Sequence, residues 1–394
     1  TYYGYCRAAC NNQANFEVVA LFDHAWFTQL AVDQAGHPRL LIATWPPESG
    51  FDPILHWIYA ECNANCTNPA AWAHVDLGNG YWYGSDTQSK QTFVLDTHGH
   101  PRLIYYAARY NAMVDPSADM RFMYCDADCT NLDQWNTTIL SDSGWYDPAL
   151  VLTPSGLPRI AFNSIGDNQL NYVECDTPTC SAGTLNTILT NSSNTNYGGP
   201  SFSLKLDGQG RPRMAYYPGL TAGTLPGGRL YYLACDANCT ATGTWRGGDI
   251  GMPTTNESGS TILQGAGGVA LALDTQDHPR IAFRMGMGMN ELGYAWCNTG
   301  CENEHTTWPY KVIWSSDAQL AEIGVPPAEG CPDCHPPIPP CPGGFWDAGF
   351  WPSLTLDAAG NPRIAYEVQL QHGGGQCDNA TWAHMTRLAV FQQP

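Results

Sequence analysis

A hairpin-like unit that occurs six times constrains the fold of this chain more than any other feature. Its clearest copy, residues 354–366 (LTLDAAGNPRIAY), has an alternating strand, a short turn and a second strand. In this turn Asp suits an Asx-type hydrogen bond, Gly tolerates positive φ, and Pro fixes the return of the chain. The prolines that mark the copies are Pro38, Pro101, Pro158, Pro212, Pro279 and Pro362. Such a repeat determines the architecture before any other signal is considered.

A second pair of strands is predicted after each hairpin. It combines alternating aromatic residues, a Cys-xxx-Cys turn and usually a Trp that opens the next strand, as in residues 57–72 and 230–245. Each repeat therefore predicts four antiparallel strands, A to D. Six such units are typical of a β-propeller with four-stranded blades. The predicted fold class is all-β, a six-bladed β-propeller.

The two ends of the chain are predicted to complete the last blade together. Residues 1–21 look like a C–D pair without a preceding hairpin, and the last hairpin lacks a Cys-xxx-Cys pair after it. A ring closed in this way protects sheet edges that would otherwise pair with other chains. Residues 381–391 are left over, either as a fifth strand of the closing blade or as a strand given to another copy. The predicted segments are blades at 22–77, 78–140, 141–190, 191–250 and 251–314, an insert at 315–350, and the last blade with its tail at 351–394.

An Arg follows the Pro of each hairpin, six residues after the Asp, and is expected to pair with it across the turn. The expected pairs are Asp33/Arg39, Asp96/Arg102, Asp207/Arg213, Asp274/Arg280 and Asp357/Arg363, whereas blade three has Thr153 in place of Asp. We interpret the pair as a device of the fold and not as a ligand site, since function seldom needs every blade to be identical.

Twelve cysteines are expected to form disulfides at the turns between strands C and D. They are Cys6/Cys10, Cys62/Cys66, Cys125/Cys129, Cys175/Cys180, Cys235/Cys239 and Cys297/Cys301. Zinc is the weaker alternative, because no blade supplies consistent His ligands. Sixteen cysteines in all indicate an oxidising compartment. We therefore expect an extracellular or cell-surface protein whose signal peptide has been removed.

The acidic composition excludes several classes of partner. The formal charge is −19 with only 17 Lys and Arg residues, so nucleic acids and anionic membranes are poor partners. No apolar run approaches the roughly 20 residues of a membrane-spanning helix. The sequence also lacks a phosphate-binding loop, a G-x-S-x-G elbow and an H-E-x-x-H motif.

The insert at 315–350 contains the one chemical motif that the repeat does not explain. Its eight prolines between Pro326 and Pro342 exclude a helix or an inner strand. Among them, Cys331-Pro-Asp-Cys334-His335 has the form C-x-x-C-H, which resembles the haem-attachment motif of c-type cytochromes. The resemblance implies thioether bonds from Cys331 and Cys334 to haem c and His335 as the proximal iron ligand.

Other interpretations of the motif stay open. If haem is attached, Cys341 and Cys377 remain to pair with each other. If Cys331 and Cys334 form a disulfide with each other instead, no cysteine is left unpaired either. A zinc site formed by Cys331, Cys334, Cys341 and His335 is the third interpretation.

A sixth iron ligand is expected from loops on the same face as the insert. His372 is preferred because its flanking glycines let the backbone approach a large ligand. His24, Met287 and Met289 are the other candidates, together with Met285. The Met-x-Met-x-Met spacing also suits apolar packing or a soft copper ion.

Three histidines occupy the same turn position in blades one, two and five. They are His37, His100 and His278, with His98 next to His100. They either hold copper or zinc at the surface or are solvated turn residues.

From these features the sequence predicts a haem-carrying propeller that transfers electrons and is not an enzyme. Its expected partners are copies of itself, in a surface filament, or an extracellular redox protein. The alternative is a non-redox structural or glycan-binding extracellular propeller.

Overall fold

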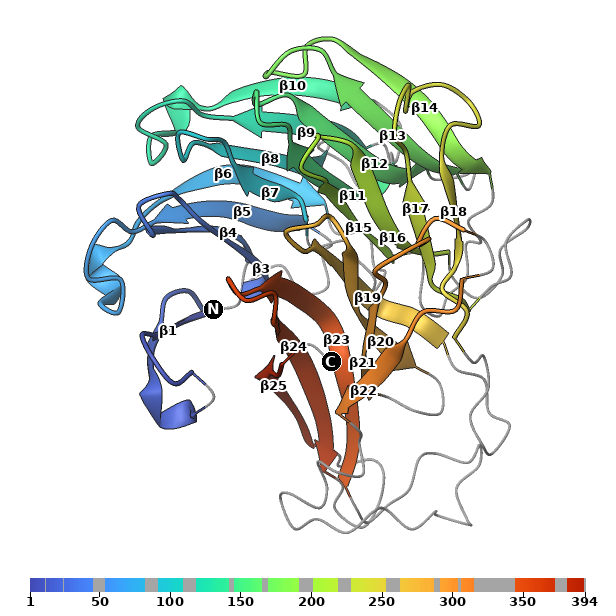
Figure 1. Cartoon of the computed structure of the whole chain (residues 1–394). Helices are drawn as coiled ribbons and strands as arrows, with labels where there is room; N and C mark the ends of the chain where they lie inside the picture. Colours follow the sequence, from blue (N-terminus) through green and yellow to red (C-terminus); the bar gives the residue numbers. More distant parts are fainter. Residues whose placement is uncertain are drawn as a thin grey trace, which may run out of the picture. The chain divides into compact units, whose positions relative to one another are not determined.

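The computed structural model of the chain confirms the all-β fold class, a six-bladed β-propeller of antiparallel sheets (Figure 1). Two compact units are described separately here: Thr1–Thr190 with Ala237–Thr244, and Asn191–Asp236 with Trp245–Pro394. The structure describes residues 1–10, 12–23, 25–44, 54–81, 91–108, 118–141, 145–164, 169–190, 201–218, 228–252, 263–286, 291–303, 306–314, 344–372 and 381–392.

The first unit contains an N-terminal hairpin and blades one to three. The hairpin is β1 (Tyr2–Cys6) and β2 (Phe16–Ala20). Blade one is β3 (Ala25–Val32), β4 (Pro38–Thr44), β5 (Ile54–Glu61) and β6 (Ala73–Tyr81); blade two is β7 (Phe93–Leu95), β8 (Pro101–Ala108), β9 (Ala118–Tyr124) and β10 (Asn136–Ser141); blade three is β11 (Trp145–Leu152), β12 (Pro158–Ser164), β13 (Gln169–Cys175) and β14 (Gly183–Thr190). Blades one and two join through a single pair, Gly80 with Ala107.

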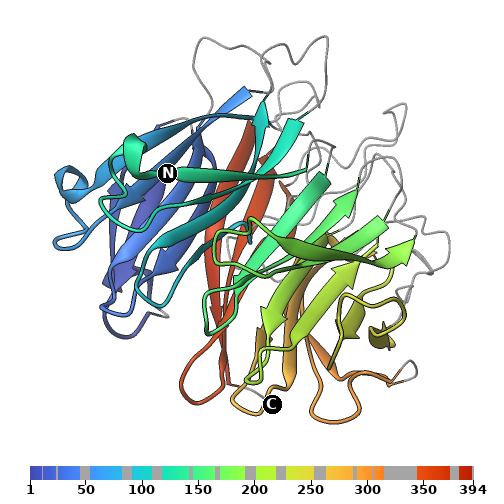
Figure 2. The same cartoon turned by 90° about the horizontal axis from the view of Figure 1, so that it is seen from above.

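The second unit contains blades four to six. Blade four is β15 (Ser201–Leu206), β16 (Pro212–Tyr217), β17 (Tyr231–Ala234) and β18 (Arg246–Asp249); blade five is β19 (Leu263–Leu273), β20 (Pro279–Gly286), β21 (Glu291–Trp296) and β22 (Tyr310–Trp314); blade six is β23 (Gly344–Leu356), β24 (Pro362–His372) and β25 (Thr381–Val390). Within each of these blades the strands lie side by side in chain order (Figure 2).

The repeated turn explains where the second strand of each blade begins. The repeat proline is the first residue of β4, β8, β12, β16, β20 and β24. Proline has no N–H to donate to a neighbouring strand, and the first residue of a strand is one of the few positions in a sheet where this is tolerated. Glycine adopts positive φ in five of these turns, for example at Gly36 with φ 86°, and blade five uses Asp277 with φ 64°.

The core lies between neighbouring blades. In the second unit, Tyr217, Tyr232, Leu271, Phe283 and Trp308 form one buried cluster that joins blades four and five. In the first unit, separate clusters join blade one to blade two and blade two to blade three. Within each unit, side chains of one sheet therefore pack against the neighbouring blade, and the core lies in layers between the sheets.

The third strand of the last blade corrects a prediction. It is β25, paired with β24 from Arg363 opposite Val390 to His372 opposite Thr381. The sequence predicted that residues 1–21 would supply this strand. They form their own two-stranded sheet, and the Tyr3 ring lies 5.2 Å from that of Trp72 in blade one.

The Arg363 side chain explains the position of β25. Its Nη1 donates to the Phe391 carbonyl at 3.4 Å. In the other blades the same Arg atom donates to the carbonyl of the cysteine that ends strand C. The strand therefore takes the place of strand C, without a cysteine. Assembly with further copies stays a prediction.

The first strand of the last blade also begins earlier than expected. β23 starts at Gly344, inside the segment 315–350 that was predicted to be an insert. Pro342 is the last proline of that segment, and the aromatic sequence that follows it favours a strand. The three helices found in the described ranges are three-residue 3₁₀ turns: η1 (Gln13–Asn15), η2 (Pro69–Ala71) and η3 (Leu132–Gln134). None of them has the length and hydropathy to span a bilayer.

Candidate ligand-binding site

The Asp–Arg pairs join the two turns at one end of each blade, as the sequence predicted. Arg39 Nη2 lies 3.1 Å from Asp33 Oδ2, and Arg213 Nη2 lies 2.8 Å from Asp207 Oδ2. The equivalent pairs in blades two, five and six are also present. Because Nη1 of each Arg donates to a carbonyl of the C–D side, one guanidinium ties together the A–B and C–D ends of its blade.

Blade three keeps this arrangement without the carboxylate. The Thr153 hydroxyl accepts the Leu157 backbone N–H at 3.0 Å, which is the bond that an Asp oxygen accepts elsewhere. Arg159 still donates to the Cys175 carbonyl at 3.0 Å. The recurring Asp or Thr and Arg residues at these turns therefore stabilise the fold. Among the described residues, blade two adds a further group of side chains at this end, which is considered below.

The predicted disulfides are confirmed for the six pairs at these turns. Five are seen as Cys6–Cys10, Cys62–Cys66, Cys125–Cys129, Cys175–Cys180 and Cys297–Cys301, and Cys235 and Cys239 are also disulfide-bonded. Residues such as Asn65 and Asp128, just before the second cysteine, have φ of 55° and 51°. Asn and Asp tolerate this conformation best after Gly. The disulfides indicate a secreted protein.

At the opposite end of the blades, the first strand also shifts its register against the second in blades one and three, and the shifts are largest in blades five and six. The register of β19 against β20 shifts between Gln264 and Val269. The register of β23 against β24 shifts twice, between Ala348 and Phe350 and between Phe350 and Ser353. Bulges of this kind re-aim side chains and are common beside functional sites.

The two bulges fit against each other. A Cβ on Gly268 would lie 2.8 Å from Pro352 Cδ and 3.0 Å from Trp351 Cα. A Cβ on Gly349 would lie 2.9 Å from the Glu291 carbonyl oxygen. Trp351 itself has φ 45°, which is a true outlier for a bulky residue and points to a functional constraint.

These bulges gather an aromatic and charged group that we call the bulge site: Arg284, Glu291, Phe350 and Trp351. The Arg284 guanidinium carbon lies 4.0 Å from the centroid of the Phe350 ring, a cation–π contact. The Phe350 and Trp351 rings lie 5.8 Å apart at 51°. Both side chains and that of Arg284 are only partly buried, so a ligand can contact them.

Two largely buried oxygen-bearing side chains come from β16 and β21 of the same unit. Tyr217 is fully buried, and its hydroxyl has no hydrogen-bond partner within the described residues. Burial raises the pKa of Tyr217, and the positive charge of Arg284 opposes that rise. Glu291 is 9% exposed and begins β21 next to Gly349.

The sequence contained a signal for this site that the repeat obscured. The run Gly265–Ala266–Gly267–Gly268 interrupts an otherwise regular strand, and an isolated or clustered Gly in a strand pattern suggests a bulge. Arg284, Phe350 and Trp351 were not predicted as site residues. Phe350 fell inside the segment interpreted as a proline-rich insert.

Most residues of the predicted haem site lie outside the described part of the chain. This applies to Cys331, Cys334, His335, Cys341 and Cys377, to His24, Met287 and Met289, and to the side chain of His372. Met285 is 1% exposed and belongs to the core of blades four and five, which supports the interpretation of apolar packing at that position.

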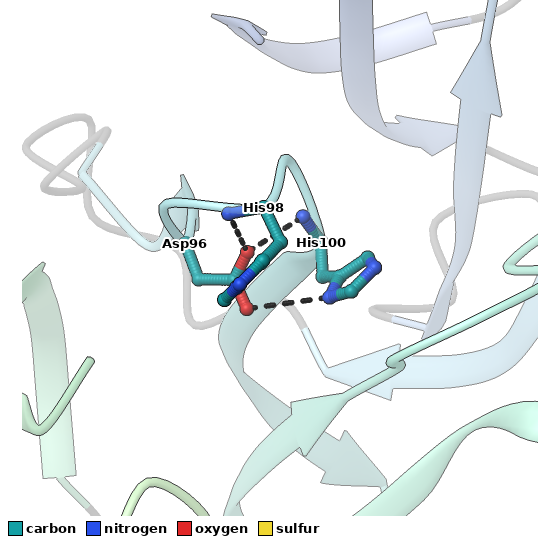
Figure 3. A group of neighbouring side chains, drawn as sticks. All are labelled: Asp96, His98 and His100. Atoms are coloured by element: carbon teal, nitrogen blue, oxygen red, sulfur yellow. Dashed lines mark hydrogen bonds and ion pairs between the residues drawn. The ribbon is translucent and has the colours of Figure 1, made fainter. Parts of the chain in front are cut away.

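The turn histidines are described, and each faces the Asp of its own turn. His37 Nδ1 lies 3.1 Å from Asp33 Oδ2, His100 Nδ1 lies 3.4 Å from Asp96 Oδ2, and His278 Nδ1 lies 3.3 Å from Asp274 Oδ2. Among the described residues, one group has three metal-ligating side chains together: Asp96, His98 and His100 (Figure 3). His98, which the sequence placed next to His100, belongs to this group, and a role of His37, His100 and His278 in binding metal stays a prediction.

Comparison with known proteins identifies similar folds at low sequence identity. No protein-family model and no curated protein sequence matches the chain. An α-L-arabinanase of Penicillium chrysogenum solved with arabinobiose is 11% identical with a TM-score of 0.47, covering 94% of each chain. The GH93 α-L-arabinofuranosidase of Fusarium graminearum is 9% identical with a TM-score of 0.46, over 94% of this chain and 93% of that one. A PL25 ulvan lyase is 12% identical with a TM-score of 0.49, over 94% and 84%.

These findings correct the predicted function. The similar structures are an arabinanase, an arabinofuranosidase and an ulvan lyase, and none of the three is an electron carrier. Electron transfer is therefore not kept as the function. The expectation that the chain is not an enzyme stays a prediction. Similarity at this level concerns the fold, and the ligand has to be argued from the side chains.

Proposed function

We propose that this protein is a secreted β-propeller that binds carbohydrate at the bulge site. The observation that carries the proposal is the pair of interlocked bulges in β19 and β23. They hold Trp351 in a left-handed conformation and bring the Phe350 ring under the Arg284 guanidinium. Strain of this kind persists only where the surrounding structure enforces it, and it clusters at ligand clamps.

The side chains at the bulge site match the two surfaces of a sugar ring. A pyranose or furanose has C–H faces that pack on aromatic rings, and the partly exposed Phe350 and Trp351 rings supply such a platform. Its hydroxyl groups need hydrogen-bond partners, and Arg284 carries several N–H donors. Ligand sites commonly combine aromatic walls with a few polar groups of this kind.

The charge of the chain favours a ligand with little negative charge. With a formal charge of −19, long-range repulsion opposes polyanions. Arg284 is the cationic member of the bulge site, so a single carboxylate on the ligand is tolerated. We therefore place neutral polysaccharides first and weakly acidic ones second.

Affinity electrophoresis or calorimetry on a panel of neutral and uronate-containing polysaccharides tests the proposal. The full-length protein is expected to be retarded by at least one neutral polysaccharide. Phe350→Ala removes the aromatic platform and is expected to abolish the retardation. Arg284→Gln is expected to weaken it by about 10–100-fold, because one charge-assisted hydrogen bond contributes about 1.5–3 kcal/mol.

A matched control comes from β22 of the same blade. Tyr310 is an aromatic residue that is 39% exposed and lies outside the bulge site. Tyr310→Ala should leave binding unchanged, and both variants should keep the wild-type melting temperature within a few degrees. Equal loss in Tyr310→Ala and Phe350→Ala, or no binding to any member of the panel, would overturn the proposal.

One observation favours a catalytic form of this function. Glu291 is largely buried, and its backbone carbonyl lies against the bulge at Gly349; its carboxylate is of the kind that supplies general acid or base catalysis in carbohydrate chemistry. The arabinanase and the polysaccharide lyase named above are carbohydrate-active enzymes. If the protein cleaves the polysaccharide it binds, Glu291→Gln is expected to stop product release while retaining retardation in the gel. Activity retained in Glu291→Gln rules out this role for the residue.

A further inference from the structure

The turn between β7 and β8 brings two imidazoles and a carboxylate together at the surface of blade two. Asp96 Oδ1 accepts the backbone N–H groups of His98 at 2.8 Å and His100 at 2.9 Å, as Figure 3 shows. Asp96 Oδ2 faces His100 Nδ1 at 3.4 Å and accepts from Arg102 Nη2 at 2.8 Å. The carboxylate therefore fixes both the backbone of the turn and the orientation of one ring.

Orientation by a carboxylate prepares His100 as a metal ligand. Histidines that bind metals usually give their other ring N–H to a carboxylate or a carbonyl, which fixes the tautomer. With Nδ1 held by Asp96, the Nε2 lone pair of His100 is left to bind a cation. His37 and His278 have the same relation to Asp33 and Asp274, but a single imidazole is a weak site.

Blade two differs from blades one and five by adding a second imidazole. Two residues after the turn Asp, blade one has Ala35 and blade five has Gln276, whereas blade two has His98. The rings of His98 and His100 stack with centroids 5.7 Å apart and 20° between planes. One ligand atom from each of Asp96, His98 and His100 lies within 4.8 Å of the others. Binding of one ion by both rings requires a rotation of the His98 side chain, which is exposed.

The neighbouring turn of blade one supports this geometry. Gln34 Nε2 donates to the Thr97 carbonyl at 2.9 Å, which holds the turn in place. Gly99 has φ 82°, and a Cβ there would lie 3.1 Å from Asp33 Cβ and 3.8 Å from Asp33 Oδ2. The Asp33 carboxylate, which is itself paired with Arg39, thus lies close to the backbone between the two histidines. The two turns share this contact, so the site is fixed by two blades.

We propose that His98 and His100 bind a divalent transition metal, copper(II) or zinc, with Asp96 as the carboxylate that orients His100. Imidazole nitrogen suits both metals, and copper(II) binds a given nitrogen site more tightly than zinc. Because Asp96 is also bonded to Arg102, it acts as an orienting partner, and the remaining positions of the ion are open to water or to a ligand. The metal site is independent of the bulge site.

Titration of the full chain with CuCl₂, followed by calorimetry, tests the proposal through a difference between variants. His98→Gln recreates the Gln of blade five at an exposed position, so the fold should be retained. This variant is expected to lose one copper equivalent, with affinity at this site reduced by more than the roughly 10–100-fold that loss of an orienting partner costs. The electron paramagnetic resonance spectrum of wild type should show coupling to two nitrogens for that equivalent.

His278→Gln is the matched control, because it removes the same Asp–His pair from blade five, where no second imidazole is present. It should leave the copper stoichiometry unchanged. An unaltered stoichiometry in His98→Gln, or an equal loss in His278→Gln, would overturn the proposal. Titration with ZnCl₂, in which imidazole proton resonances of His98 and His100 should shift together, gives a second readout.

Discussion

The two ends of a blade in this propeller follow different rules. At the turn end, the same Asp, Pro, Arg and disulfide recur, and each is explained by contacts inside its own blade or with the next turn. At the other end, the register of the first strand shifts furthest in blades five and six, and an aromatic residue of blade six takes a strained conformation. Repetition therefore marks residues that stabilise the fold, and local departures from it mark residues available for function.

The largest loss of stability is expected from breaking a buried Asp–Arg pair at the turn end of a blade. In blade four Asp207 and Arg213 are 6% and 4% exposed. Asp207→Thr, which recreates the turn of blade three, is expected to lower the free energy of unfolding by about 3 kcal/mol. This is the low end of the cost of a broken buried pair, because Asp236 still accepts from Arg213 at 2.8 Å. Equilibrium denaturation with urea measures the change.

Thr153→Ala in blade three is the control, since it removes only the hydroxyl that accepts from Leu157. Its expected cost is about 1 kcal/mol, the value of one hydrogen bond. Neither variant should change glycan retardation. A cost for Asp207→Thr no greater than that of Thr153→Ala would show that the pair is not a main stabilising contact.

Two glycines of β23 and its turn provide a direct comparison of the two ends within one blade. Gly349 and Gly360 have φ of 84° and 82°, but a Cβ on Gly360 would meet nothing within 4 Å, whereas one on Gly349 would press on the Glu291 carbonyl. Gly360→Ala should cost about 1–2 kcal/mol from left-handed strain alone. Gly349→Ala should cost about 2–3 kcal/mol, because overpacking is added.

The functional readout separates the two glycines further. Gly349→Ala shifts the bulge and is expected to weaken polysaccharide binding, while Gly360→Ala should leave it unchanged, as measured in the same electrophoresis assay. Equal binding by both variants would mean that the β23 bulge does not shape the ligand site.

The sequence predicted the repeated part of the molecule well and its irregular part poorly, for physical reasons. Residues such as Asp33, Pro38 and Arg39 act within a few positions of one another, so spacing alone indicates their contacts. The choice of β25 as the third strand depends on pairing between segments far apart in the chain. Residues 1–21 and residues 381–391 both have the pattern of strands that could take this position, and the periodicity of the sequence does not distinguish between them.

The bulge site was missed because it depends on strand register. A bulge changes which side chains share a face, and the repeat pattern treats β19 and β23 as ordinary first strands. The packing of Gly268 against Trp351 and Pro352 joins residues more than 80 positions apart. For the proposed metal site, the sequence named His100 and placed His98 beside it, but spacing alone did not show that Asp96 fixes the His100 ring.

A smaller effect is expected from removing one disulfide. Cys62–Cys66 closes a loop of sequence separation four inside blade one. Cys62→Ser with Cys66→Ser should lower the free energy of unfolding by about 2 kcal/mol in the chain-entropy model. Cys6→Ser with Cys10→Ser removes a loop of equal length from the separate N-terminal hairpin. The loss of global unfolding free energy should be smaller for this second pair, because a two-stranded hairpin by itself is only marginally stable. Equal losses in the two pairs would assign the hairpin to the same cooperative unit as blade one.

The smallest change in unfolding free energy is expected from lowering the pH. It should arise from the turns that contain Asp and not from the Thr turn of blade three. Burial alone would raise the pKa of Asp274, but the backbone N–H groups of His278 and Gln276 and the Arg280 guanidinium outweigh it and hold the pKa below its ordinary value. A carboxyl with a lowered pKa stabilises the folded state above its unfolded pKa, near 3.9, and that stabilisation is lost as pH falls through the folded pKa. The difference in unfolding free energy between wild type and Asp274→Thr should therefore be largest at neutral pH and should shrink below about pH 4. Thr153→Asp introduces the same group in blade three, and any stability it adds at neutral pH should disappear over the same range. A difference that stays constant with pH in both variants would show that the carboxylate acts by its shape and not by its charge.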